Sequence, residues 1–384
     1  MSKTTHKKFN LAGPCDPANH YTIPVLRRLP VIEEMIEAKN YFIMRAPDKS
    51  GKTTFINALT DKINADGHFY AIACSLVSLR SVKLKSEVAT AIVAALNQSM
   101  AASKVDVIKL KAFAFDSASG MLSPERKIRN CLKYLCEDLD KELVVFFEES
   151  DSLSGAGLMT FLSQLKEGHA SRQRPGKKFP RSIGLVGVRS VHDLGDPNEA
   201  GKDVIGPREM FNISKATVTY PNFTREEIRS LLQKYTIDTG QQVSVQAIDR
   251  VWFWTEGQPW LVNALANETV AKILNNDYEQ LVNSSHIDLA AKAFFPRRET
   301  NIHNLLERLI EPRTRRIMEP FIVGASWKKQ ATKADIQYAL DMGFMKREGR
   351  TYLPTNPMSA EIIFGTLAGH LFETVANQIC ANDS

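Results

Sequence analysis

The chain has 384 residues and a formal net charge of +6; 43% of its residues are hydrophobic and 24% are charged. This composition excludes a disordered or fibrous chain, and the length exceeds one ordinary hydrophobic core, so we expect a soluble globular protein of two or three domains. The net charge permits contact with nucleic acid but does not require it.

The N-terminus and the cysteines argue against secreted and membrane classes. Residues 1–8 lack the apolar core of a signal peptide, and no apolar run approaches the roughly 18 residues that cross a bilayer, so we expect a cytoplasmic protein without membrane contact. The five cysteines are scattered and odd in number, which disfavours a disulfide framework. Cys131 and Cys136 are expected to be half-buried thiols rather than metal ligands.

The most specific motif is APDKSGKT at residues 46–53, directly after an apolar run that predicts a buried strand. It matches the phosphate-binding pattern G-x-x-x-x-G-K-[ST], with Ala46 in place of the first glycine. Gly51 lets the main chain approach the phosphates, and the N-terminus of the following helix favours their negative charge. We expect Lys52 to reach the β- and γ-phosphates of ATP and the Thr53 hydroxyl to ligate Mg²⁺. The predicted nucleotide-contacting residues are Ala46, Pro47, Asp48, Lys49, Ser50, Gly51, Lys52, Thr53 and Thr54.

A second element of such a site is the strand predicted at 143–149, LVVFFEE. Its apolar run is unbroken, as in a parallel strand covered by helices on both faces. We expect Glu148 to hold the Mg²⁺ shell and Glu149 to activate the attacking water. Glu148 stands where aspartate is usual, and its longer side chain predicts looser metal coordination and slower hydrolysis.

Two further strands are predicted at 70–76 and 182–188, and Arg189 follows the second. Ligands of open parallel sheets bind at the carboxyl ends of the strands, so Arg189 is a candidate sensor of the γ-phosphate. A surface arginine at a strand end is an equal alternative. The alternation of strands and helices through about residue 220 predicts an α/β core with a parallel sheet.

From Asn222 onward, helical periodicity replaces this alternation. Thr224 and Glu227 predict a capping box, and a helical bundle extends to about residue 275. Within the bundle, TEGQPWL at 255–261 interrupts the apolar helices. This segment is either an ordinary helix–helix turn or a loop whose Pro259 packs on the adenine.

The C-terminal part contains two arginine-rich stretches at 296–298 and 313–316, then a predicted helix at 333–342 and a hairpin at 344–353. A helix followed by a basic hairpin is the layout of a winged helix, which binds DNA in some proteins and other proteins in others. The basic cluster at 172–181 also leaves alternatives open: a solvated loop, or contact with nucleic acid or an adjacent subunit.

These boundaries divide the chain into four parts: an N-terminal segment at 1–40 that leads into the core, a P-loop core at 41–221, a helical lid at 222–280, and a helical linker with a winged-helix-like domain at 281–384.

Several segments together resemble a prokaryotic family of AAA-like P-loop ATP-binding proteins. They are FNLAGPCDP at 9–17, the phosphate loop, EESDSL at 148–153 and GQPWLVNAL at 257–265. The order of motifs is also similar to the STAND signalling ATPases and to archaeal AAA-like ATPases. The resemblance implies ATP and Mg²⁺ as cofactors, γ-phosphate sensing by Arg189, contact of Pro259 with the base, and a winged helix after the lid.

The sequence is compatible with three functions. The leading one is a nucleotide-dependent switch with slow Mg²⁺-dependent ATP hydrolysis, whose winged helix reports the bound state to a protein partner. The second is a DNA-binding ATPase that uses Lys346, Arg347, Arg350 and the basic loop, and the third is a nucleotide-binding scaffold that does not hydrolyse ATP. Homo-oligomerisation is compatible with each, and an arginine finger at Arg172, Arg174 or Arg181 is not decided by the sequence.

Overall fold

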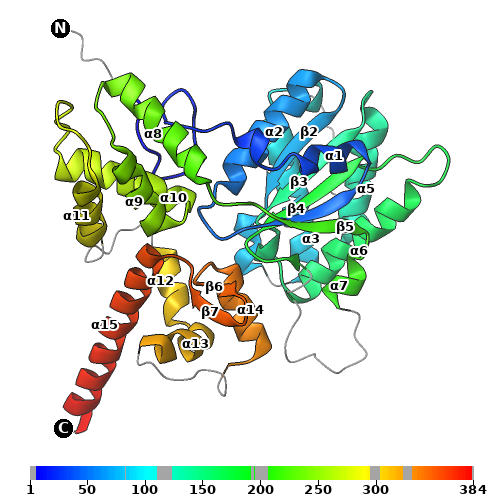
Figure 1. Cartoon of the computed structure of the whole chain (residues 1–384). Coiled ribbons are helices and arrows are strands. Elements are labelled where there is room, and N and C mark those ends of the chain that lie inside the picture. Colours follow the sequence, from blue (N-terminus) through cyan, green and yellow to red (C-terminus); the bar gives the residue numbers. More distant parts are fainter. Residues whose placement is uncertain are drawn as a thin grey trace. The chain divides into compact units, whose positions relative to one another are not determined.

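Figure 1 shows the computed structural model, which describes residues 6–82, 84–109, 123–191, 194, 206–294, 303–322 and 331–382. The chain divides into two compact units. We call Val25–Ala46 with Lys52–Tyr220 the sheet unit, and Met1–Pro24 with Pro47–Gly51 and Pro221–Ser384 the helical unit. The arginine-rich stretch predicted at 296–298 lies outside the described residues.

The sheet unit contains a five-stranded parallel sheet in the order β2-β3-β4-β1-β5. Every residue of β3 and β4 is buried, as the unbroken apolar runs predict, whereas β5 alternates between partly buried and exposed positions at its edge of the sheet. Because β4 lies between β1 and β3, the segments that follow these three strands are neighbours at the carboxyl edge. The strands are Tyr41–Arg45 (β1), Tyr70–Ser75 (β2), Leu143–Glu148 (β3), Ser182–Gly187 (β4) and Ser214–Thr219 (β5).

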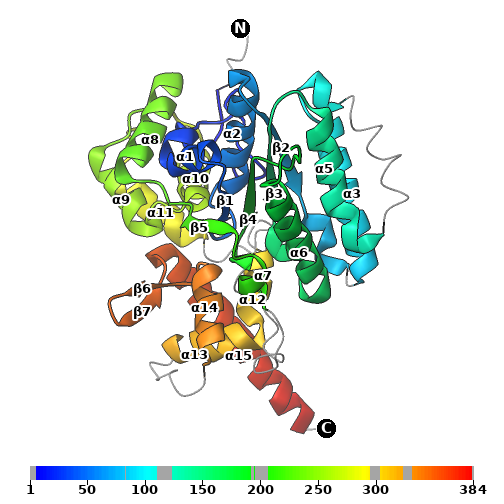
Figure 2. The same ribbon diagram turned by 90° about the vertical axis from the view of Figure 1, so that its right-hand side faces the viewer.

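Helices cover both faces of this sheet, as Figure 2 shows. One face packs against α1 (Val31–Glu37) and α2 (Lys52–Asp66), and the other against α3 (Lys85–Ala101), α5 (Pro124–Asp138) and α6 (Gly155–Ser171). Short helical elements complete the unit: η1 (Val25–Arg28), η2 (Val77–Ser81), η3 (Ser150–Ser152) and α7 (Pro207–Met210).

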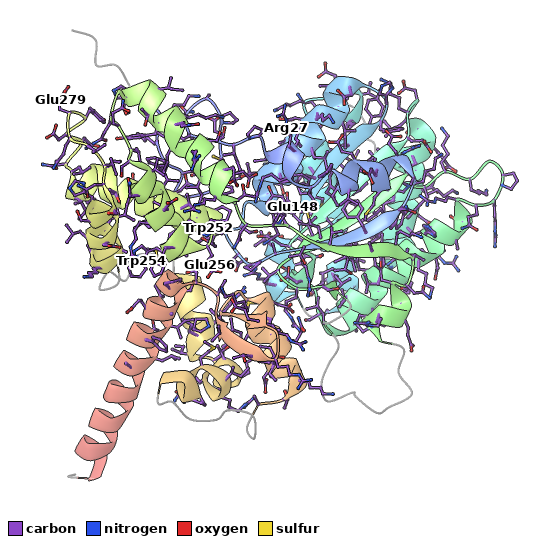
Figure 3. All side chains as sticks on the ribbon, in the orientation of Figure 1. Arg27, Glu148, Trp252, Trp254, Glu256 and Glu279 are labelled. Carbon is purple, nitrogen blue, oxygen red and sulfur yellow. The ribbon has the colours of Figure 1, made fainter. Side chains whose placement is uncertain are left out.

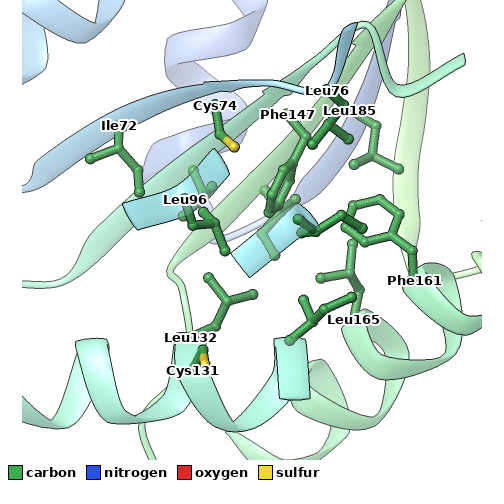
Figure 4. Close-up of a cluster of buried hydrophobic side chains, with 14 of the residues drawn as sticks. Ile72, Cys74, Leu76, Leu96, Cys131, Leu132, Phe147, Phe161, Leu165 and Leu185 are labelled. Atoms are coloured by element: carbon green, nitrogen blue, oxygen red, sulfur yellow. The ribbon is translucent and has the colours of Figure 1, made fainter. Parts of the chain in front are cut away.

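The larger apolar cluster lies between the sheet and α3, α5 and α6 (Figure 4). Phe147 and Leu185 from the strands pack there with Leu132 and Phe161 from the helices. Cys131 belongs to the same cluster, where burial raises the pKa of its thiol to about 12. The two thiols of α5 are therefore buried, more deeply than the half-buried position expected from the sequence.

The helical unit begins its bundle with the predicted capping box. Thr224 Oγ1 accepts a hydrogen bond from the Glu227 N–H at 3.1 Å, and the Thr224 N–H donates to Glu227 Oε2 at 2.7 Å. Two of the four main-chain N–H groups left over at a helix start are satisfied in this way. The bundle comprises α8 (Arg225–Thr239), α9 (Val245–Thr255), α10 (Pro259–Asn267), the π-helix η6 (Glu268–Ile273) and α11 (Ser284–Phe294).

The C-terminal part contains the predicted short helix and hairpin. The hairpin strands pair antiparallel, with Met345 opposite Pro354 and Glu348 opposite Thr351. The elements are α12 (His303–Ile310), α13 (Pro312–Ile322), α14 (Lys333–Asp341), β6 (Met345–Glu348), β7 (Thr351–Pro354) and α15 (Pro357–Asn382). A winged-helix identity for this part stays a prediction. Among the helices that the structure describes, none combines the length and apolar character needed to cross a bilayer.

Candidate nucleotide-binding site

The phosphate loop joins β1 to α2 at the carboxyl edge of the sheet. The Ala46 N–H donates to the Gly187 carbonyl at 3.1 Å, which fastens the start of the loop to the end of β4. Gly51 has a φ of 92°, a left-handed conformation that favours glycine, and α2 begins at the next residue, Lys52. The local order of strand, turn and helix is therefore the one that the motif requires.

Three side chains of the predicted site come together in the sheet unit. The Lys52 ammonium donates to the Ala46 carbonyl at 2.6 Å, so it folds back over the loop. The Thr53 side chain is hydrogen-bonded to Glu148 at the end of β3, and Figure 3 labels this glutamate. Glu148 is 7% exposed. Burial raises the pKa of its carboxyl, and the hydrogen bond from Thr53 opposes this shift in part.

This donor set fits Mg²⁺. A threonine hydroxyl and a carboxylate are the hard oxygen ligands that Mg²⁺ prefers, and phosphate and water oxygens complete its shell in P-loop proteins. Within the described ranges, no group of three or more His, Cys, Asp or Glu side chains is arranged to hold a metal ion. A P-loop magnesium site does not need such a group.

Glu149 does not continue the strand. The sequence predicted a strand through 149, but β3 ends at Glu148, and Glu149 has φ 55° and ψ 38°. A non-glycine residue in this left-handed region costs about 1 kcal/mol, and such residues concentrate at functional sites. The Ser75 hydroxyl at the end of β2 donates to Glu149 Oε2 at 2.9 Å. Ser75 is a site residue that the sequence reasoning missed.

Arg189 lies two residues beyond β4, the strand between β1 and β3. Its main chain therefore emerges between the ends of β1 and β3. Asp151 belongs to the EESDSL segment, but the sequence assigns it no role. A Cβ added to Gly187 would lie 2.5 Å from Asp151 Oδ1, so only glycine accommodates this close carboxylate at the end of β4.

The middle of the phosphate loop, Pro47–Gly51, belongs to the helical unit by its contacts. The Lys49 ammonium lies 4.3 Å from the centre of the Trp260 ring, and Trp260 directly follows Pro259 at the start of α10. Asp48 Oδ2 lies 3.4 Å from Arg308 Nη1 of α12. Loop residues are thus in contact with both the lid segment and the C-terminal part of the helical unit.

Ser50 is the most deeply buried polar residue of this loop segment. It is 2% exposed, and its hydroxyl has no hydrogen-bond partner among the described residues. Lys49, beside it, has a φ of 61°. A buried hydroxyl without a partner normally carries a free-energy penalty, which a ligand that hydrogen-bonds to it removes.

The basic loop at 172–181 lies at the opposite, amino edge of the sheet, where two of its arginines bind main-chain carbonyls. Arg181 is 8% exposed; its guanidinium donates to the Ile36 and Glu37 carbonyls at 2.9 and 2.6 Å and forms an ion pair with Glu142. Arg172 donates to the Pro180 and Lys39 carbonyls, among others. These two arginines are structural cations, which disfavours them as contacts for nucleic acid.

Lys346, a predicted DNA contact in the hairpin, is also partnered within the chain. Its ammonium lies 2.6 Å from both carboxylate oxygens of Glu256 and 3.1 Å from Glu348. Glu256 precedes the Gly257-Gln258-Pro259 turn and has a φ of 43°; Figure 3 labels it in the helical unit. Lys346 therefore joins the hairpin to the turn at the end of α9.

No protein-family model and no curated protein matches the chain. Among solved structures, it is similar to the Walker-type ATPase PABY2304 of Pyrococcus abyssi, with a TM-score of 0.60 and 17% identity over 92% of this chain and 99% of that one. Looser matches are ORC2 of Aeropyrum pernix (TM-score 0.49, 10% identity, 97% and 98% covered) and the RuvB Holliday junction branch migration motor of Thermotoga maritima (0.45, 12%, 86% and 91%). This chain therefore shares the fold of the Walker-type ATPase from Pyrococcus abyssi, with a five-stranded parallel sheet as its core.

Proposed function

We propose that this chain binds ATP with Mg²⁺, hydrolyses it slowly and acts as a nucleotide-dependent switch. The observation that carries the proposal is the arrangement of Lys52, Thr53 and Glu148 at the carboxyl edge of the sheet. An ammonium, a hydroxyl and a buried carboxylate lie there at the N-terminus of a 15-residue helix, whose dipole favours a phosphate.

Each side chain has a separate role in this proposal. Lys52 leaves the Ala46 carbonyl to hold the β- and γ-phosphates, while Thr53 and Glu148 hold the metal, which neutralises phosphate charge when bound. Glu149 orients the attacking water and accepts its proton, and Arg189 senses the γ-phosphate. Pro259 packs on the base. Hydrolysis is slow because Glu148 is longer than the usual aspartate and Glu149 is hydrogen-bonded to Ser75.

The switch is supported by the contacts of the loop segment within the helical unit. Lys49 contacts Trp260, and Asp48 contacts Arg308. A phosphate bound to this loop competes for the two cations, Lys49 and Arg308. We expect nucleotide binding to change the environment of α10 and α12 in consequence. Lys346 extends this connection, because it joins Glu256 to the hairpin.

A DNA-binding function gains no specific support. Of the cations proposed for it, Lys346, Arg172 and Arg181 have partners within the chain. Arg347 donates to the Gly349 carbonyl at 2.9 Å. The alternative is a scaffold that binds ATP without hydrolysis; it predicts that Glu149→Gln leaves phosphate release unchanged.

Titration calorimetry with ATP and Mg²⁺ tests the proposal. Lys52→Ala should weaken binding by about 100-fold, the effect of losing one charge-assisted phosphate contact. Lys62→Ala is the matched control, since Lys62 lies on the same helix and pairs with Glu33, and it should bind as the unaltered chain does. Hydrogen exchange in α10 and α12 should change on ATP addition. Equal ATP affinity of Lys52→Ala and the unaltered chain would contradict the proposed site. Unchanged amide exchange in α10 and α12 on ATP addition would contradict the proposed switch.

A further inference from the structure

A groove of about 830 Å³ runs beside β2, the strand at one end of the sheet, and lies wholly in the sheet unit. Its floor is the outer edge of β2. One wall is α2, which contributes polar residues such as Asn64, and the other is α3, which contributes small ones, among them Ala91, Ala94 and Ala95. Figure 2 shows α2 and α3 on opposite sides of β2.

The hydrogen-bond pattern of β2 decides which main-chain groups face the groove. In a parallel pair, alternate residues of a strand bond to the same neighbour. The Tyr70 and Leu76 N–H groups donate to the Glu142 and Glu148 carbonyls, both at 2.9 Å, so the even-numbered residues of β2 face β3. Ala71, Ala73 and Ser75 therefore turn their N–H and C=O groups toward the groove.

One of these three positions already has a partner that imitates a neighbouring strand. The Asn64 side-chain amide donates to the Ala71 carbonyl at 3.0 Å and accepts from the Ala71 N–H at 2.8 Å. A peptide group of an adjacent strand would make the same pair of bonds. Ala73 presents the same donor and acceptor two residues on, and no strand of the described residues pairs with this side of β2.

We propose that this groove binds an extended peptide segment that pairs with Ala73 and Ser75 as an added strand. A peptide main chain fits this edge, because Ala73 and Ser75 each present a donor and an acceptor two residues apart, which is the spacing of a peptide strand. The alanines of α3 leave room for its backbone. Polar side chains of α2 and the Asp61–Lys104 ion pair, 2.8 Å between charged atoms, lie opposite the alanines of α3. Because successive side chains of a strand point to opposite faces, this favours a peptide with polar side chains on one face and small apolar ones on the other.

The carboxyl end of the groove meets the candidate nucleotide site, since Ser75 and Glu148 both line it. The binding itself does not depend on ATP, because every group that pairs with the peptide belongs to β2. A failure of ATP binding at Lys52 would therefore leave peptide binding to this groove unchanged.

Selection of random displayed peptides of about ten residues, the length of a long strand, tests the proposal with the full chain and no nucleotide. A synthetic copy of the most enriched peptide is then titrated by fluorescence anisotropy. Ala73→Pro removes the groove-facing N–H and leaves the ladder to β3 intact, because that ladder uses the neighbouring residues. We expect about 10-fold weaker binding, and Ala73→Ser, which keeps the N–H, should bind as the unaltered chain does.

A second pair of variants keeps the test decisive if the proline variant does not fold. Ala94→Phe places a ring in the groove from an exposed position of α3, and Ala101→Phe places the same ring at an exposed position of that helix outside the groove. Only the first should lose peptide binding. The bound peptide should also slow amide exchange at Ala73 and Ser75. If no peptide is enriched, or if the enriched peptides bind Ala94→Phe and the unaltered chain equally, the proposed site is wrong.

Discussion

The two edges of the parallel sheet hold their charged side chains in opposite ways. At the amino edge, the buried Arg181 guanidinium is matched by two carbonyls and by Glu142. At the carboxyl edge, burial raises the pKa of the Glu148 carboxyl, and the main chain of Glu149 is in a left-handed conformation.

This difference supports the proposal that the amino edge stabilises the fold and the carboxyl edge binds a ligand. Removing one partner of a buried, hydrogen-bonded charge is strongly destabilising, whereas buried carboxylates with raised pKa values and strained neighbours concentrate at functional sites. Both edges contain conspicuous charged motifs in the sequence. Their different roles follow from what each charge contacts, and three variants test the contrast.

The largest expected effect is at the amino edge. Arg181→Ala should lower the free energy of unfolding by about 3 kcal/mol, because it removes the hydrogen bonds to the Ile36 and Glu37 carbonyls and one of the two cationic partners of Glu142. Denaturation by urea measures this loss. Arg174→Ala, an exposed arginine of the same loop, should change stability by less than about 0.5 kcal/mol. An equal and small effect of both substitutions would show that the amino edge is not stabilised by Arg181.

The next effect is at the carboxyl edge and concerns rate instead of stability. Glu149→Gln should lower ATP hydrolysis by about 100-fold with little change in ATP affinity, because an amide does not accept the proton of the attacking water. Phosphate release measures the rate, and calorimetry measures the affinity. Glu87→Gln, an exposed acid on α3, should retain the full rate.

The Glu149 variant also separates the switch from the scaffold. If phosphate release is the same with glutamate and glutamine at this position, no catalysis takes place there. The chain would then be a nucleotide-binding scaffold, and the left-handed turn at Glu149 would need another explanation.

The smallest effect is a pH dependence at the amino edge. Burial alone raises the pKa of Glu142, but hydrogen bonds from Lys39 and Arg181 outweigh it and leave the pKa below its ordinary value of 4.5. A lowered pKa stabilises the fold above the unfolded-state pKa, and this contribution disappears as the pH falls through the folded-state value. Glu142→Gln should therefore cost about 0.5 kcal/mol at pH 7, a value reduced by solvent screening at this half-exposed side chain.

Urea denaturation at pH 7 and at successively lower pH measures that difference. The gap between Glu142→Gln and the unaltered chain should close below about pH 4.5, the ordinary pKa of the group. In an Arg181→Ala background, the same substitution should have a smaller effect, because one partner is already missing. A gap that widens on acidification would contradict the assignment of Glu142 as an ionised partner.

Much of the fold follows from local sequence signals. The apolar runs predict β1, β3 and β4 to within a residue or two, because fully buried parallel strands tolerate few other residues. The capping box at Thr224 and the turn at Gly349 are equally local, and both are observed. The loop at 46–53 is also predicted from local sequence, because its glycine and the start of its helix lie within the same eight residues.

Contacts between distant residues could not be predicted in the same way. The basic cluster at 172–181 has the composition of a nucleic-acid contact, but its two best-placed arginines bind carbonyls that are far away in the sequence, Ile36 and Lys39. Lys346 likewise pairs with Glu256, ninety positions earlier. The local sequence around a charged side chain does not show whether solvent, a ligand or another residue of the same chain will compensate its charge.

Local patterns were therefore enough to predict the parallel-strand core, the phosphate loop and the pair of acids after β3, because each depends on the chemistry of neighbouring residues. The order of the strands, the bond between Ser75 and Glu149, and the edge of β2 beside Asn64, with which no described strand pairs, are visible only in the folded chain. These features arise where separate elements meet. Their geometry is set by packing of the whole sheet, which no local stretch of the chain encodes.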